Sequence, residues 1–312
     1  MNDTQTTANP LGYEKIGKLL TSYAVPSIIA LIINSLYNMV DQIFIGQGVG
    51  FLGNGATNII APIATITIAI ATLFGDGLAA FFSLNLGKGE GEKAAKGLGT
   101  SILFGSIFGI IWTVLAFVFL KPLCLIFGAT ENILPYALDY GRIIVIGFTF
   151  QIVGNTINSA IRTDGSPRYA MLSMMIGAVL NIILDPVFIF VFHWGVEGAA
   201  TATVISQLFG LLFNIAYLFR MKTIRLSRQS FTLDIRTAGR IASLGFASGA
   251  NNLTSTVVAF VSNNLMTKYG ALSPYGADIP LTTFGLCMKV SMLAFSIGIG
   301  VASGSQPIIG FN

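Results

Sequence analysis

Residues 169–192 read YAMLSMMIGAVLNIILDPVFIFVF, an apolar run interrupted by one amide and one acid, Asn181 and Asp185. A helix that crosses a bilayer needs about 20 mostly apolar residues, so this run is long enough to span a membrane. Ionisable side chains are costly inside a bilayer and usually serve a function where they occur. The stretch therefore predicts a membrane helix that carries a polar site.

The rest of the 312-residue chain has the same character. Hydrophobic residues make up 54% of it and charged residues 10%, whereas a soluble domain has about 25% charged residues. Together with the first stretch, eight spans are predicted near residues 20–45, 57–86, 97–120, 141–161, 169–192, 198–219, 240–268 and 282–306. These runs show no alternating pattern, so we predict an all-α polytopic membrane protein and not a transmembrane barrel.

The basic residues predict the orientation. With a cytoplasmic N-terminus, thirteen of the seventeen Lys and Arg residues fall in inside segments, Lys121, Arg142 and Lys268 fall outside, and Lys289 lies within the last span. Because cytoplasmic loops are rich in Lys and Arg, we predict a multi-pass protein of the cell membrane with its N-terminus inside. This one-sided distribution accounts for the net charge of +4 without a nucleic-acid partner. The first 19 residues are polar and show no removable signal peptide.

Residues 220–239 form a basic connector between the sixth and seventh spans. Two interpretations of its positive charge remain open. The charge can serve only to set the topology during insertion, or the connector can also contact anionic lipid head groups.

A weak internal repeat appears when the chain is shifted by 222–223 residues. The shift places Gly75, Gly77 and Gly87 over Gly298, Gly300 and Gly310, and it places Asp41 over Asn263. The spacing indicates a six-helix lobe over 1–219, the connector over 220–239, and the first two helices of a parallel second lobe over 240–312. A complete second lobe needs roughly another 140 residues, so we expect the chain to be a fragment with about eight of twelve helices.

Polar residues recur at helical spacing in four spans. In the first, fourth, fifth and sixth spans they are Asn34, Tyr37, Asn38 and Asp41; Gln151, Asn155, Asn158 and Arg162; Asn181 and Asp185; and Thr203, Gln207 and Asn214. Residues three, four and seven apart share one helix face, so each set forms a stripe. The stripes predict an aqueous cavity within a helical bundle. Hydrogen bonding between helices is the alternative for the asparagines.

The two acids, Asp41 and Asp185, lie a few residues from the outer ends of their spans, so they can share one pocket. Two neighbouring carboxyls can hold a proton between them, or both can ionise around a bound Na⁺, so we expect ion coupling there. Pro26 and Pro186 each remove one helical hydrogen bond and are predicted bends near these sites.

Several other patterns carry less weight. Residues 48–53, GVGFLG, match GxGxxG but lie between membrane helices with no preceding strand, so they predict a turn. The GxxxG pairs Gly105/Gly109, Gly245/Gly249 and Gly300/Gly304 predict close helix packing. The two cysteines do not suggest a disulfide framework or a zinc site, and no catalytic motif is present, so we expect no enzyme. The roles of Asp76 and Lys289 stay open.

The chain resembles the multidrug and toxic compound extrusion (MATE) transporters. The likeness rests on VPSIIALIINSLYNMVDQIFIGQGVG, GDGLAAFFSLNLGKGEGEKA, IRTDGSPRYAM, NIILDPVFIF, GAATATVISQ and GSQPIIGFN, in this order. The resemblance implies twelve helices in two lobes and alternating access. It implies that Asp41, Asn181, Asp185 and Thr203 bind Na⁺ or a proton, that Tyr37 and Asn158 line the cavity, and that Pro26 bends the first helix.

We therefore expect a monomeric antiporter that exports cationic or amphipathic compounds in exchange for Na⁺ or H⁺, with no other cofactor. Two alternatives remain: a flippase for lipid-linked oligosaccharides, which needs more basic residues in its cavity, and an inactive transporter fragment.

Overall fold

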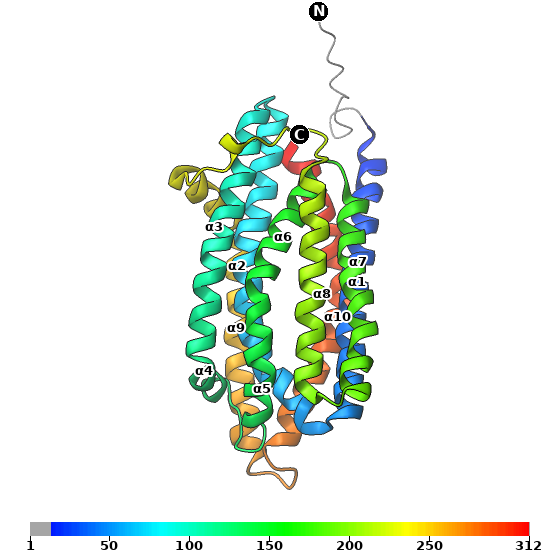
Figure 1. Ribbon diagram of the computed structural model, residues 1–312, viewed down its shortest axis with the longest axis vertical. Coiled ribbons are helices and arrows are strands. Elements are labelled where there is room, and N and C mark those ends of the chain that lie inside the picture. Colours follow the sequence, from blue (N-terminus) through cyan, green and yellow to red (C-terminus); the bar gives the residue numbers. More distant parts are fainter. Residues whose placement is uncertain (1–13, 312) are drawn as a thin grey trace, which may run out of the picture.

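The computed structural model describes residues 14–311, apart from the side chain of Lys289. The predicted absence of a signal peptide concerns residues that lie mostly outside this range, and the role of the Lys289 side chain lies outside it too. Every regular element in the described range is a helix, which confirms the all-α prediction. The helices form one elongated bundle (Figure 1).

The first part of the bundle contains eight α-helices. They are α1 (Ile16–Gly48), α2 (Phe51–Gly87), α3 (Gly91–Val118), α4 (Leu120–Ile126), α5 (Leu134–Ile144), α6 (Phe148–Thr163), α7 (Pro167–Pro186) and α8 (Gly195–Leu218). Short irregular turns extend two of them: the 3-10 turn η2 (Val145–Gly147) joins α5 to α6, and the π-turn η3 (Val187–Val191) continues α7. After the connector, which contains the 3-10 turn η4 (Arg228–Ser230), come α9 (Ile235–Gly270) and α10 (Asp278–Phe311).

Seven segments of the described chain are long and apolar enough to cross a membrane, one fewer than predicted. The segment that differs is the predicted span 240–268. It lies in α9, a helix of 36 residues, but α9 is less apolar than the other seven, with asparagines, serines and threonines along it. The fourth predicted span, 141–161, is assembled from the end of α5, η2 and α6. The GxGxxG segment forms the predicted turn, in which Gly50 has a φ of 93° between α1 and α2.

The start of α1, the connector and the end of α10 all lie at one end of the bundle, and the α9–α10 turn lies at the other (Figure 1). Both ends of the described chain lie at the same end of the bundle because the chain crosses the bundle an even number of times. We call the first the connector end and the second the hairpin end.

Helices α9 and α10 pack against the first two helices in a reciprocal manner. Helix α9 packs along α2, and α10 packs along α1 and also touches α2. If α9 is the repeat of α1 and α10 is the repeat of α2, then the α1–α10 contact and the α9–α2 contact are equivalent: each joins the first helix of one repeat to the second helix of the other. This exchange is what a two-fold axis between parallel repeats produces.

Glycines bring both of these helix pairs into close contact. A Cβ on Gly77 would overlap the Ile241 carbonyl oxygen, and a Cβ on Gly245 would overlap that of Leu73. On the other pair, a Cβ on Gly304 would lie 2.5 Å from the Ala24 Cα. Gly105 and Gly109 likewise face α6. The structure thus confirms close packing at Gly245/Gly249 and Gly300/Gly304, since small residues allow helix backbones to approach. In the third pair Gly109 lies close to α6, whereas a Cβ on Gly105 would make only ordinary contacts.

At the hairpin end, side-chain hydrogen bonds connect α9 and α10 to the segment between α4 and α5. Asp278 accepts hydrogen bonds from Thr130 Oγ1 at 2.7 Å and Asn132 Nδ2 at 3.3 Å. Nearby, Asn264 donates to the Ile126 carbonyl and Thr267 to that of Gly128. The bundle is therefore held together at this end by side chains of both parts of the chain.

We predict that Gly245→Ala destabilises the purified protein although Ala is the better helix former. The added methyl overlaps α2, and such overpacking costs about 1–3 kcal/mol. Gly239→Ala is the matched control on the same helix, because nothing lies within 4 Å of a Cβ there. The measurement is the thermal unfolding midpoint in detergent. A midpoint for Gly245→Ala equal to or above that of Gly239→Ala would contradict the packing described.

Candidate functional site

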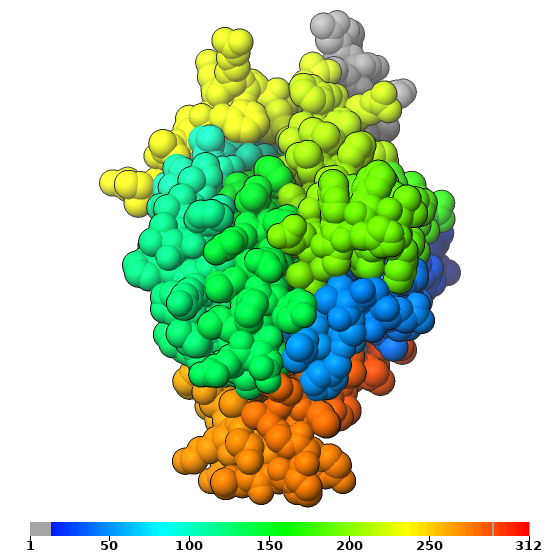
Figure 2. All heavy atoms as spheres, turned by 60° about the horizontal axis from the view of Figure 1, so that its bottom comes forward, coloured from blue at the N-terminus to red at the C-terminus, as the bar shows by residue number. Residues whose placement is uncertain are grey.

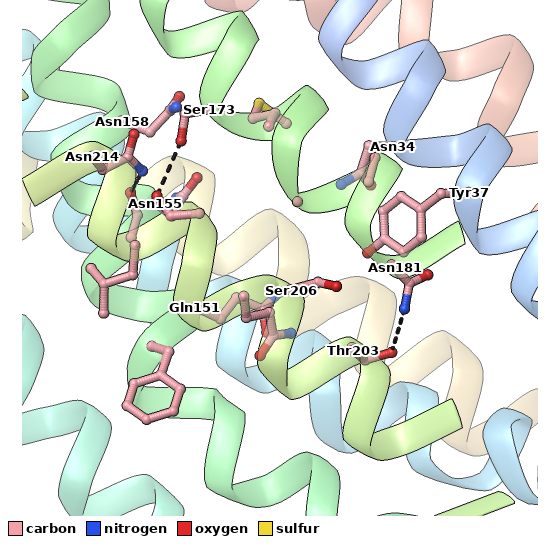
Figure 3. Close-up of a pocket in the computed structure, with 18 residues that line it drawn as sticks. Asn34, Tyr37, Gln151, Asn155, Asn158, Ser173, Asn181, Thr203, Ser206 and Asn214 are labelled. Atoms are coloured by element: carbon pink, nitrogen blue, oxygen red, sulfur yellow. Dashed lines mark hydrogen bonds between the residues drawn. The ribbon is translucent and has the colours of Figure 1, made fainter. Parts of the chain in front are cut away.

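Helices α1, α6, α7 and α8 surround a cavity of about 190 Å³. All four predicted polar stripes contribute to it, and Figure 3 shows their side chains converging. Its polar lining consists of Asn34, Tyr37, Gln151, Asn155, Asn158, Ser173, Asn181, Thr203, Ser206, Gln207 and Asn214. The other lining residues are apolar or glycine, and no charged residue is among them.

Asn181 links α7 to α8 at the wall of this cavity. Its amide nitrogen donates to Asp185 Oδ1 at 3.2 Å and to Thr203 Oγ1 at 3.3 Å. Asn181 and Asp185 lie one helical turn apart, and both are buried. The amide therefore uses its two hydrogens to hold a carboxyl and a hydroxyl in place.

The second acid reaches this group from another helix. Asp41 on α1 is also buried, and its carboxyl interacts electrostatically with the Asp185 carboxyl. The structure thus brings together Asp41, Asn181, Asp185 and Thr203 from three helices. The pairing depends on the packing of α1 along α7.

Several oxygens of this site have no hydrogen-bond donor within the described structure. They include Asn181 Oδ1, Asp185 Oδ2, Ser206 Oγ and Gln207 Oε1. Buried polar atoms are normally satisfied, so these oxygens point to a water or an ion as their partner. Carboxylate, amide and hydroxyl oxygens are ligands that hard cations prefer. The donor set therefore fits Na⁺.

The predicted lining residues do not all lie in the cavity. Asn34, Tyr37, Asn155, Asn158 and Gln207 line it, whereas Asn38 is not among the lining residues. Instead, the Asn38 amide donates to the Asn34 backbone oxygen at 2.7 Å. This bond lies within α1, so Asn38 neither lines the cavity nor bonds between helices.

Some of the lining amides also tie helices together. Asn158 donates to the Ala170 carbonyl at 3.0 Å, and Asn214 donates to the Gly154 carbonyl at 3.0 Å. These bonds join α6 to α7 and α8 to α6, so the two residues shape the cavity as well as line it.

Two serines of the lining were missed at the sequence level. Ser206 lies three residues after Thr203, and Ser173 lies eight before Asn181, so both follow the stripes already recognised. Helical spacing alone was the available signal. Serine is common in membrane helices at packing positions, and this made it less conspicuous than Asn or Asp.

The two predicted proline bends lie in different surroundings. Pro26 is buried within α1, which continues as one helix from Ile16 to Gly48. Pro186 is the last residue of α7, and the chain continues from it as the π-turn η3. Asp185 therefore lies where the regular helix ends.

Asp76 lies outside this cavity. It interacts electrostatically with the half-buried Arg162 on α6, whose guanidinium donates to Ser159 Oγ at 2.9 Å. The Asp76 backbone oxygen accepts from Gln306 Nε2 on α10 at 2.9 Å. Asp76 thus lies where α2 meets both α6 and α10.

A family model described as MatE matches residues 26–187. The match covers more than half of the chain and includes Pro26, Asp41, Asn181 and Asp185. The chain belongs to the MatE family. The resemblance to the MATE transporters is therefore confirmed, and the protein is a multi-pass membrane protein of this family.

Two curated relatives of this MatE chain are called multidrug export protein MepA. The protein of Staphylococcus saprophyticus is 27% identical over 302 residues, and that of Staphylococcus aureus is 25% identical over 306. Each alignment covers 95% of this chain and 64% of the relative. The chain thus spans less than two thirds of the length of these relatives.

Solved structures agree with the fold. The MATE multidrug transporter DinF-BH superimposes with a TM-score of 0.90 at 31% identity, over 96% of this chain and 66% of that one. A MOP superfamily transporter from Pyrococcus furiosus gives a TM-score of 0.85 at 24% identity, over 100% and 67% of the chains. The second similarity concerns the fold alone.

We predict that Thr203→Val weakens cation binding by about tenfold, the scale expected when a supporting contact of an ion site is lost. Valine has the shape of threonine but offers no acceptor to Asn181. A bound ion stabilises the folded state, so the unfolding temperature rises as the site fills. The measurement is the midpoint of this rise in two separate titrations, one with Na⁺ and one with pH. Thr203→Ser keeps the acceptor and should behave like the wild type. Equal midpoints for Thr203→Val and wild type would contradict the role of Thr203.

Proposed function

We propose that this chain carries the coupling-cation site of a MATE-family antiporter. The transporter exchanges Na⁺ or H⁺ for cationic or amphipathic drugs across the cell membrane by alternating access. The observation that carries the proposal is the buried pair of acids, Asp41 and Asp185, which lies behind the cavity wall at Asn181, beside oxygens that have no hydrogen-bond donor in the described structure. The names of the relatives support drug export, since both are described as multidrug export proteins.

The charge of the acid pair supports ion coupling. Two ionised carboxylates in contact repel each other strongly away from water, so the pair favours a shared proton or a bound cation. Asn181 donates to one of the carboxyls and so keeps it oriented in either state. The pair therefore alternates between a proton-bound or Na⁺-bound state and a more negative state, and the negative state attracts a cationic compound.

The size of the cavity supports separate binding places for the coupling ion and the drug. About 190 Å³ is below the roughly 300–1,000 Å³ of pockets that hold drug-sized ligands. The cavity suits an ion with its waters. The drug then takes a wider path between the two lobes, and the two processes communicate through the shared helix α1.

We further propose that residues 1–219 form one lobe, that 220–239 connect the lobes, and that 240–312 belong to the second lobe. The reciprocal packing of α1 with α10 and of α2 with α9 supports this division. In the second lobe Asn263 replaces the acid of the first, so coupling is concentrated in residues 1–219. The orientation has the connector end in the cytoplasm, and the protein acts as a monomer with no cofactor besides the coupling ion.

The flippase alternative gains no support from the site. A flippase that moves anionic lipid-linked sugars needs cations along its path, and the sequence offers only Lys289 well within a predicted span. Drug export therefore remains the better proposal.

We predict that Asp41→Asn and Asp185→Asn each abolish gradient-driven transport of a fluorescent cation while leaving the fold intact. An amide cannot release a proton and contributes no charge to Na⁺, so the loss should be tenfold or more, about the effect of removing an ion ligand. The measurement is uptake of ethidium into proteoliposomes under imposed Na⁺ or pH gradients, with unfolding midpoints as the check on folding.

Asp139→Asn provides the matched control, because it removes a carboxyl from α5 outside the site. It should transport like the wild type. Normal transport by both site variants across the pH and Na⁺ series would refute the coupling assignment. Dye accumulation that is independent of both gradients in the wild type would refute antiport.

A further inference from the structure

The connector and the first turns of α9 present six exposed cations at one end of the molecule. They are Arg220, Lys222, Arg225, Arg228, Arg236 and Arg240. None of them takes part in the ion pairs found in the described range. In Figure 2 the yellow segment that carries most of them lies at the end opposite to the α9–α10 turn. These cations, called the connector cations below, have no protein counter-ion there.

The acid that lies among them is already engaged. Asp234 pairs with Lys96 on α3 and caps the start of α9 through the amides of Arg236 and Thr237. The hydrogen bond from Lys96, followed by these amides, lowers the pKa of Asp234 to about 2. Asp234 is therefore occupied by other partners and leaves the field of the connector cations largely uncompensated.

The connector is held in a fixed conformation. Its start is bound by Asp164, a buried carboxyl that accepts from the backbone amides of Lys222 and Thr223 at 2.8 and 2.9 Å. Its middle is anchored by Ile224, which packs into a core cluster with residues of α2 and α3. Its end is tied to α3, where Thr100 donates to the Thr232 carbonyl at 3.0 Å.

Large apolar side chains stand exposed beside the same cations. Phe219 is 88% exposed, Ile235 77% and Leu233 61%. Exposing such apolar surface to water is unfavourable, whereas burying it in lipid is favourable. Phe219 follows α8 and Ile235 begins α9, so both lie at the level where these helices leave the bundle. Apolar side chains next to cations at this level match a membrane interface, where the acyl region meets the phosphates.

We infer that the connector is a binding surface for anionic phospholipid head groups of the cytoplasmic leaflet. The connector cations contact the phosphates, and Phe219, Leu233 and Ile235 enter the adjoining acyl region. This inference rests on the membrane orientation given under the proposed function. A role in topology alone requires positive charge during insertion, and it requires neither a three-point anchorage nor exposed apolar side chains.

The test measures phospholipid binding to the purified chain in detergent, by native mass spectrometry and by the shift of the unfolding temperature. Wild type should bind phosphatidylglycerol at least about tenfold more tightly than phosphatidylcholine, because each cation near the lipid surface favours the anionic head group. Arg225→Gln/Arg228→Gln removes two exposed cations that anchor nothing, and it should lose about tenfold in phosphatidylglycerol affinity. Leu233→Ser should weaken lipid binding without changing the net charge.

The matched control is Lys15→Gln/Lys88→Gln, which removes two exposed cations of the same end outside the connector. It should keep the affinity of the wild type. The inference is overturned if both double variants lose affinity equally, if the two lipids bind alike, or if inorganic phosphate stabilises the protein as well as phosphatidylglycerol does. Because the readout does not involve transport, failure of ion-driven export leaves this result standing, and the reverse also holds.

Discussion

The proposed function depends on one interaction, the pairing of the two buried carboxyls of Asp41 and Asp185. Asp41 and Asp185 come from helices far apart in sequence, and in a medium of low dielectric they cannot both stay ionised at close range without a counter-charge. Asn181 and Thr203 orient the group through hydrogen bonds of 3.2 and 3.3 Å. The packing of α1 against α7 and of α7 against α8 serves to keep these four residues together.

The same helix that carries Asp41 also borders the rest of the molecule. Helix α1 lies along α10, and Gly300 and Gly304 bring the two backbones together at Ile28 and Ala24, on either side of Pro26. A change of charge at Asp41 therefore acts on the helix whose other face forms the contact with α10. Packed helices move as discrete units, so the proposed coupling of ion binding to a rearrangement of the proposed lobes can act through this helix.

Much of the architecture could be predicted because its causes are local. Membrane-length apolar runs predict helices directly, and the polar stripes at helical spacing predicted which faces of α1, α6, α7 and α8 meet. The prediction was less accurate where tertiary packing decides. Helix α9 is less apolar than a typical span. Asn38 bonds to its own helix, because a small rotation about the helix axis separates a position in the cavity from a position in a packing contact.

Other features were beyond prediction from the sequence. The anchorage of the connector by Asp164 joins residues about 58 positions apart, and the Asp278 contacts join residues nearly 150 positions apart. Neither follows a period that the sequence displays. The electrostatic interaction of Asp76 with Arg162 similarly depends on the packing of α2 against α6.

The most direct test of the central claim is infrared difference spectroscopy of the purified chain, which detects protonated carboxyl groups. In Na⁺-free buffer near neutral pH, we expect a protonated-carboxyl band that disappears on addition of Na⁺ or at high pH, and that is missing from both Asp41→Asn and Asp185→Asn. A spectrum without such a band, or a band that persists unchanged in both variants, would contradict the claim that these two acids hold the coupling ion.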